Sequence, residues 1–214
     1  MKKILVFLQK GLRRPLVLCY SVYVLWTALG GLYGFAADSL LRASGRLTTT
    51  ELSVADFTPV NLEQEGEGWR STTADPQLLY QVDGRVTTVR VFMSFDADPG
   101  ELDLYYIEQP GEDYDKYRRV WAVQQDDGSY LYQLPRADIW EIRLDPGSAE
   151  NLGINITEIR INEPVGIGFY FDLSLNGLFR LIVWPALAAA VLAWLTGVWD
   201  AVRKKQKEKP ESGR

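Results

Sequence analysis

The 214-residue sequence contains no histidine, and its only cysteine is Cys19. Without histidine the chain has no Ser-His-Asp triad, no Cys-His pair and no histidine-bound metal. A single cysteine excludes an internal disulfide, which a domain of ordinary size does not need. We therefore expect no enzyme of these classes and no cofactor that depends on them.

Charge is missing from two long apolar runs near the ends of the chain. Residues 15–37 contain no charged residue, and residues 178–199 contain only Arg180. A helix of about 20 apolar residues spans the hydrocarbon core of a bilayer. We therefore predict transmembrane helices over residues 16–37 and 178–199. A cleaved signal peptide is the alternative for the first run, which is longer than a usual signal-peptide core.

Basic residues lie on the terminal side of both apolar runs. They are Lys2, Lys3, Lys10, Arg13 and Arg14 before the first run, and Arg203, Lys204, Lys205, Lys207 and Lys209 after the second. By the positive-inside rule, residues 1–15 and 200–214 are predicted to be cytoplasmic. The first segment contacts membrane lipid as an interfacial anchor, or it is simply a solvated flank.

The part between the runs is acidic. Residues 38–177 contain 25 acidic and 11 basic residues, a balance that repels the phosphates of nucleic acid. It suits a domain that faces water outside the membrane. Residues 38–50 are predicted to be a polar connector to that domain.

Period-two alternation dominates residues 51–175, and no useful helical period is present. Turn formers such as Asp83-Gly84 and Pro110-Gly111 separate the strands. The predicted strands are Ser53–Val60, Leu78–Val82, Val86–Phe95, Leu102–Glu108, Arg119–Gln125, Ser129–Leu134, Ile139–Asp145, Ile154–Asn162 and Val165–Leu173. This pattern predicts an all-β, jelly-roll-like sandwich outside the membrane, flanked by two transmembrane helices. An immunoglobulin-like arrangement lacks its Cys–Trp–Cys signature here.

The stretch 138–162 predicts a β-hairpin unit. Ile139–Asp145 alternates as a half-buried strand, Asp145-Pro146-Gly147 ends it, and Ile154–Asn162 returns. Arg143 and Asp145 lie two residues apart and therefore share a face. They form a structural ion pair, or Asp145 caps the turn by accepting its backbone amides, or the two side chains hold a sugar hydroxyl.

Six segments together resemble a β-sandwich module that is attached to bacterial membrane glycosyltransferases and other cell-envelope polysaccharide proteins. The segments are WRSTTADPQLLYQV (69–82), VTTVRVFMSF (86–95), LDLYYIE (102–108), DDGSYLYQLP (126–135), IWEIRLDPG (139–147) and INITEIRIN (154–162). The resemblance implies a carbohydrate-binding-like jelly roll outside the bacterial cytoplasmic membrane. This chain differs by having no catalytic domain, which favours a non-enzymatic accessory role.

Aromatic residues are numerous in the central domain, and sugar rings stack on such side chains. The predicted ligand-binding residues are Trp69, Tyr106, Trp121, Tyr132, Arg143 and Asp145. The alternative is that most of these rings fill the core between the sheets. In Tyr105-Tyr106, alternation requires one ring to point inward and the other outward.

Carboxylates in turns offer two further alternatives. Asp96, Asp98, Asp103, Glu112, Asp113 and Asp115 are the candidates for glycoside hydrolysis, but their loop contexts favour solvated carboxylates. The segment Asp96–Asp103 resembles a short calcium loop, although it lacks several ligands of an EF-hand. We expect a turn there, with structural calcium as the alternative.

Small residues in the apolar runs predict close helix packing at Gly30 and Gly34, and at Ala186 and Ala190. The leading hypothesis is an accessory membrane protein of cell-envelope glycan synthesis or export. It would bind saccharide and dock on a membrane glycosyltransferase, a transporter or a second copy of itself. The rival hypothesis is a structural or assembly subunit that uses the sandwich as a protein–protein interface.

Overall fold

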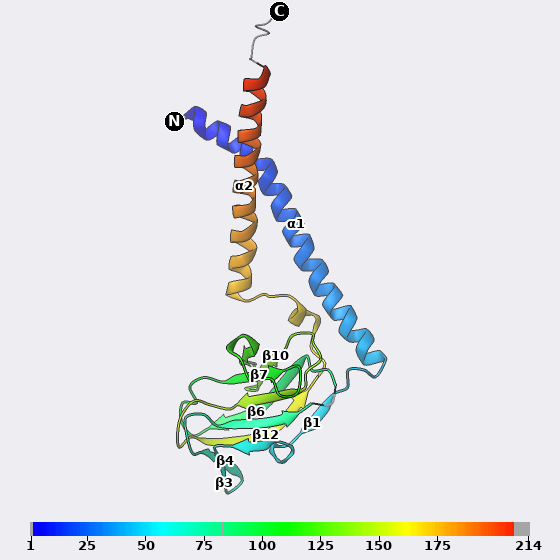
Figure 1. Cartoon of the computed structure of the whole chain (residues 1–214), viewed down its shortest axis with the longest axis vertical. Coiled ribbons are helices and arrows are strands. Elements are labelled where there is room, and N and C mark those ends of the chain that lie inside the picture. Colours follow the sequence, from blue (N-terminus) through cyan, green and yellow to red (C-terminus); the bar gives the residue numbers. More distant parts are fainter. Residues whose placement is uncertain (1, 83, 208–214) are drawn as a thin grey trace, which may run out of the picture. The chain divides into compact units, whose positions relative to one another are not determined.

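The computed structural model describes residues 2–82 and 84–207, so Asp83 of a predicted turn and residues 208–214 of the predicted basic tail lie outside them. The chain divides into two compact units. One comprises the chain up to Ala37 and from Gly166 onward, and the other comprises Asp38–Val165. Figure 1 shows the two long helices and the strands of the sandwich.

The long helices are α1 (Lys2–Ala43) and α2 (Leu175–Lys207). Their segments Leu12–Ala43 and Leu175–Val202 are long and apolar enough to cross a membrane, with mean hydropathy of 1.6 and 2.0. Only 6% and 11% of their apolar windows are buried, whereas a core helix of a soluble protein buries most of its apolar surface. Two such helices are compatible with a two-pass membrane protein. Helix α1 also runs into the predicted connector 38–50.

Burial along the helices differs from the predicted small-residue stripes. Gly34 is buried and Ala186 is half-buried, but Gly30 and Ala190 are exposed. Ala189, in the same alanine-rich run, is fully buried. The local pattern of small residues was visible in the sequence, but it did not fix which turn of the helix faces a neighbour.

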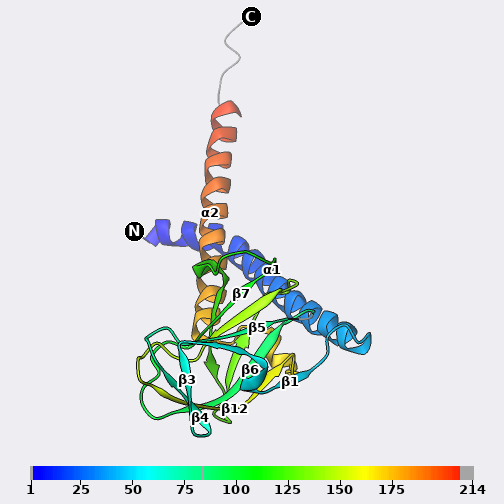
Figure 2. The same cartoon turned by 60° about the horizontal axis from the view of Figure 1, so that its bottom comes forward.

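The strands of the second unit form two antiparallel sheets (Figures 1 and 2). Among the described residues, a seven-stranded sheet has the order β3-β4-β12-β6-β10-β9, with β1 also beside β12. Its strands are β1 (Thr50–Leu52), β3 (Leu62–Glu65), β4 (Gly68–Ser71), β6 (Thr88–Phe95), β9 (Val123–Gln124), β10 (Tyr130–Gln133) and β12 (Gly153–Ile161). A five-stranded sheet has the order β2-β5-β11-β7-β8. Its strands are β2 (Thr58–Val60), β5 (Gln77–Gln81), β7 (Asp103–Ile107), β8 (Arg119–Trp121) and β11 (Glu141–Asp145).

The predicted hairpin of residues 138–162 is wrong. Strand β11 pairs with β5 and β7, whereas β12 pairs with β1, β4 and β6 in the other sheet. The Ser148 amide donates to the Pro99 carbonyl at 2.8 Å, and Leu152 is buried. These contacts direct the chain from one sheet to the other. Both strands were predicted, but their pairing was not.

Three further strand predictions need correction. Val165–Leu173 contains the 3₁₀ helix η3 (Ile167–Tyr170) in place of a strand. Ser53–Val60 begins with the 3₁₀ helix η1 (Val54–Asp56), because the Asp56 carboxylate accepts the Ser53 amide at 2.7 Å. Arg119–Gln125 divides into β8 and β9, which belong to different sheets.

The hairpin β3–β4 was not predicted. Its strands meet at Gly66, whose φ of +63° is a conformation that glycine adopts without strain. The acidic residues Glu63, Glu65 and Glu67 obscured the alternation of this segment. The hairpin extends the seven-stranded sheet through the contact of β4 with β12.

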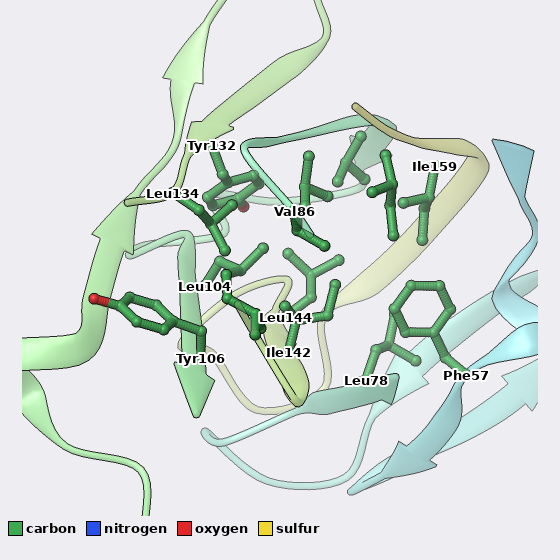
Figure 3. Close-up of a cluster of buried hydrophobic side chains, with 14 of the residues drawn as sticks. Phe57, Leu78, Val86, Leu104, Tyr106, Tyr132, Leu134, Ile142, Leu144 and Ile159 are labelled. Carbon is green, nitrogen blue, oxygen red and sulfur yellow. The ribbon is translucent and has the colours of Figure 1, made fainter. Parts of the chain in front are cut away.

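The hydrophobic core fills the space between the sheets. Strands of the five-stranded sheet contribute Leu78, Leu104, Tyr106, Ile142 and Leu144, and those of the other contribute Val89, Val91, Tyr132, Ile159 and Ile161. Figure 3 shows many of these side chains meeting in one cluster together with Val86 and Phe57. Each fully buried aliphatic side chain contributes about 1.5–3 kcal/mol to folding.

The two ends of the sandwich unit lie beside each other. In the register of β1 with β12, Thr50 is opposite Ile161. The Arg42 guanidinium donates to the carbonyl oxygens of Asn162 at 2.6 Å and Glu163 at 3.1 Å. These contacts join the segment that leads into the sandwich to the segment that leaves it.

Candidate functional site

A regular grid of polar and aromatic side chains covers the outer face of the five-stranded sheet. In β7, Leu104 and Tyr106 enter the core, so alternation directs Asp103 and Tyr105 to the opposite face. The register places Trp121 and Asp145 on either side of Asp103, and Arg119 and Arg143 on either side of Tyr105. We call these six residues, Asp103, Tyr105, Arg119, Trp121, Arg143 and Asp145, the arginine–aromatic face.

Arg143 is held by carboxylates and aromatic rings together. Its guanidinium bonds both oxygens of Asp145 at 2.7 Å and reaches Asp75 at 2.6 Å. The guanidinium carbon lies 5.1 Å from the centre of the Tyr105 ring and 5.6 Å from that of Tyr114. Cation–π contact and bidentate pairing therefore fix the orientation of this side chain.

Arg119 repeats this arrangement on β8, on the other side of β7 from Arg143. It pairs with Asp103 and with Glu101, each at 2.5 Å. Its guanidinium carbon lies 5.0 Å from the centre of the Trp121 ring and 5.8 Å from that of Tyr105. The Tyr105 ring thus stands between two guanidinium groups, and Trp121 ends the row.

The two aspartates of the face differ from ordinary surface carboxylates. The side chains of Asp103 and Asp145 are almost covered, and they lie opposite each other in the register of β7 with β11. Burial raises the pKa of Asp145 to about 6, although the hydrogen bonds from Arg143 act in the opposite direction. The face therefore contains a carboxyl group that titrates closer to neutrality than usual.

Tyr114 closes one side of the face. Its hydroxyl donates to the Glu141 carboxylate, and its ring meets the Tyr105 ring edge-on with centres 6.4 Å apart. Burial, and to a smaller extent the hydrogen bond to Glu141, raises the pKa of Tyr114. Tyr114 was not among the six predicted ligand-binding residues, and it lies in a segment without regular structure.

The other side of the face is open to solvent. Trp121 is 61% exposed, and Tyr117 in the 3₁₀ helix η2 (Lys116–Arg118) is 81% exposed. Lys116 lies over the Tyr117 ring at 5.1 Å. Large aromatic surfaces are therefore available to a ligand next to the ordered polar groups.

The predicted ligand-binding residues separate into three places. Trp121, Arg143 and Asp145 lie together on the arginine–aromatic face. Tyr106 and Tyr132 point into the core, where Tyr132 is fully buried, so neither ring is available to a surface ligand. Tyr105 is the outward ring of the Tyr105-Tyr106 pair. Placing Leu104 in the core would have predicted this, because Leu104 and Tyr106 share one face of the strand and Tyr105 lies on the other.

Trp69 lies in the other sheet, beside a shallow hollow of about 350 Å³. Arg70 also lines the hollow, and it forms ion pairs with Glu65 and, at 3.3 Å, with Asp96. The Asp96 carboxylate also accepts the Gly153 amide at 2.8 Å. Trp69 packs partly against the core, so this hollow presents mainly polar groups.

The turn carboxylates are occupied by local hydrogen bonds. Asp98 accepts the Gly100 amide at 3.0 Å, Glu112 accepts the Glu108 amide at 3.0 Å, and Asp115 accepts the Tyr117 amide at 2.9 Å. Within residues 2–82 and 84–207, no group of three or more Asp, Glu, Cys or His residues is arranged to hold a metal ion. The calcium alternative for Asp96–Asp103 thus finds no ligand set there.

No protein-family model and no curated protein match the sequence. Among solved structures, the chain is similar to the low-affinity xylan-binding module CBM86 from Roseburia intestinalis, with a TM-score of 0.38, 10% identity, and coverage of 56% of this chain and 99% of that one. CBM32 of AlyQ, in complex with 4,5-unsaturated mannuronic acid, matches with a TM-score of 0.37 and 11% identity, over 54% of this chain and 99% of that one. The C-terminal CBM6 of LamC from Zobellia galactanivorans matches with a TM-score of 0.36 and 11% identity, over 54% of this chain and 100% of that one.

These three neighbours are carbohydrate-binding modules. Other matched structures are parts of enzymes, including a carbohydrate esterase from Cellvibrio japonicus. The likeness to these four structures covers 54–56% of this chain, at 8–11% sequence identity. Attachment to membrane glycosyltransferases stays a prediction.

Proposed function

We propose that this chain is a non-enzymatic, membrane-tethered saccharide-binding protein that assists cell-envelope glycan synthesis or export. The observation that carries the proposal is the arginine–aromatic face, where the exposed Trp121 ring adjoins ordered guanidinium and carboxylate groups. A sugar ring stacks its C–H face on an indole, while its hydroxyls bond to nearby charged groups.

The polar groups of the face are suited to hydroxyl recognition. Arg119 and Arg143 are each fixed by two carboxylates, so a ligand meets donors and acceptors that are already oriented. The carboxylates of Glu101 and Asp75 remain largely exposed and can accept bonds from hydroxyls. Little side-chain entropy is lost when such a site binds.

The proposed location is a bacterial cytoplasmic membrane, with both termini in the cytoplasm and the sandwich outside. Two exposed apolar helices and the basic residues at their terminal ends support this topology. Tethering keeps the module near envelope glycans at high effective concentration. An affinity near 1 mM, worth about 4 kcal/mol, is then sufficient.

The test uses the full chain in lipid nanodiscs and a panel of envelope saccharide fragments, with binding measured by saturation-transfer NMR. Trp121→Ala is expected to abolish the signal, because it removes the exposed ring without opening the core. Trp140→Ala, which truncates another partly exposed tryptophan, is the matched control and should bind like the wild type. Equal binding by Trp121→Ala would contradict the proposed site.

A structural or assembly subunit is the second candidate, and one observation favours it. Trp121 on β8 and Val123 on β9 are exposed, as is Tyr117 in η2, and β8 and β9 end their respective sheets. Exposed apolar residues on sheet edges are typical of protein contacts. If no saccharide binds, but Trp121→Ala and Val123→Asp both release a co-purifying membrane partner or dissociate a homo-oligomer, this second function holds.

A further inference from the structure

A hollow of about 400 Å³ lies among α1, the segment before α2 and the first turns of α2, all within one compact unit. Its walls are largely apolar. Tyr23 and Trp26 contribute from α1, and Leu178 and Leu181 contribute from α2. Trp26 is 76% exposed, so its ring presents a wide apolar surface there.

Arg180 also lines this hollow and is the only charged residue in the apolar run 178–199. In the part of the chain that the structure describes, its guanidinium has neither an ion pair nor a hydrogen bond. Asp172 lines the hollow as well, and its Oδ1 accepts the Ser174 hydroxyl at 2.5 Å and the Ser174 amide at 3.3 Å. Among the described residues Asp172 forms no ion pair with Arg180, so the guanidinium keeps its donors for an incoming anion.

We propose that this hollow holds one anionic phospholipid, with its phosphate on Arg180 and an acyl chain against Trp26 and Leu181. A guanidinium group matches phosphate oxygens with two parallel hydrogen bonds. Arg180 lies close after the start of α2 at Leu175 and near the start of the apolar run 178–199, where the proposed membrane topology puts lipid headgroups. A net anionic lipid is preferred, because a zwitterionic lipid carries its own competing cation.

The glycines of α1 make the hollow testable. A Cβ atom at Gly31 would lie 2.5 Å from the Phe171 ring, so that glycine is required by packing within the protein. A Cβ atom at Gly30 would meet no atom within 4 Å, although Gly30 lines the hollow. A larger side chain at Gly30 therefore occupies the lipid volume without displacing protein atoms.

The experiment is native mass spectrometry of the full chain released from nanodiscs that contain equal amounts of anionic and zwitterionic lipid with the same acyl chains. We expect the wild type to retain one anionic lipid. Arg180→Gln and Gly30→Leu should each lower its retention about tenfold, and Arg180→Lys should lower it less. Gly197→Leu, at another helical position with open space around it, is the matched control and should retain the lipid.

Each result decides the proposal. Retention of no lipid by the wild type, or of both lipids equally, overturns it. Equal retention by the wild type and Arg180→Gln overturns it also, because the phosphate contact would then be elsewhere. If Gly30→Leu retains the lipid, the hollow is not the site. β-Sheet circular dichroism of every variant verifies that the chain has folded.

Discussion

The Arg143 guanidinium donates from Nε and Nη2 to the two carboxylate oxygens of Asp145, and both bonds are 2.7 Å long. The two residues lie two apart on β11 and share its outer face. Of the alternatives for this pair, the structural ion pair is therefore present in the protein. Its contact with a sugar hydroxyl stays a prediction of the proposed function.

Replacing Arg143 with alanine should destabilise the sandwich by about 3 kcal/mol, because the covered carboxylate of Asp145 loses its partner. Thermal unfolding of the full chain, followed by β-sheet circular dichroism, measures the change. Arg160→Ala is the control, since its pairs with Glu158 and Glu163 are more exposed and should be worth under about 1 kcal/mol. If Arg143→Ala and Arg160→Ala lower the free energy of unfolding equally, the covered pair is not more stabilising than the exposed pairs, and the prediction is wrong.

The raised pKa of Asp145 predicts a pH dependence of stability. Burial raises this pKa from 3.8 to about 6, so the folded state binds the proton more tightly than the unfolded state does. The contribution of this group to the free energy of unfolding therefore falls as pH rises from about 4 to 6, by about 3 kcal/mol in total. Asp145→Asn should remove this component of the pH profile. A carboxyl carbon titration by NMR with a midpoint near 4 would refute the prediction.

Asn162 should be among the most sensitive positions outside the core. Its φ is +56°, its Oδ1 accepts the Thr87 amide at 2.8 Å, and its Nδ2 donates to the Arg85 carbonyl at 2.6 Å. Asn162→Ala leaves buried backbone groups unpaired and should cost about 2–4 kcal/mol. The control is Asn151→Ala, at an exposed residue with φ of +60°, which should cost about 1 kcal/mol for its backbone conformation alone.

The proposed topology is tested with single cysteines in a Cys19→Ala background. Asp126→Cys lies on an exposed turn of the sandwich and should react with membrane-impermeant maleimide in intact cells. A cysteine in place of Ser212, which lies beyond the described residues, should react only after the membrane is opened. The reverse pattern would invert the predicted orientation.

Alternation along single strands was the most informative signal in the sequence. It located β11 and β12 closely and required Tyr105 and Tyr106 to face opposite ways. Alternation did not assign Tyr106 to the core. Which of the two alternating sets of side chains faces inward depends on which face of the strand the other sheet covers. For the same reason, Trp121, Arg143 and Asp145 could be named as candidates, but their meeting on one face depends on the register of β8, β7 and β11.

Strand partners were the least predictable feature. The Asp145-Pro146-Gly147 turn is equally compatible with a hairpin and with a change of sheet, and the contacts of Ser148 and Leu152 decide between them. Tyr114 and Glu101 joined the candidate site from loops, where no periodicity applies. Their roles follow from long-range packing around two arginines.

The antiparallel contact of β1 with β12 has a mechanical consequence. Force applied to the two ends of the sandwich unit is carried by the Arg42 bonds to Asn162 and Glu163 and by the register partners Thr50 and Ile161. We expect the Arg42 bonds to break first, and the β1–β12 ladder then to open one pair at a time from that end. Strands β7, β8 and β11, which carry the arginine–aromatic face, belong to the other sheet. We therefore expect a load on the β1–β12 ladder to leave the arginine–aromatic face, which lies in the other sheet, unchanged.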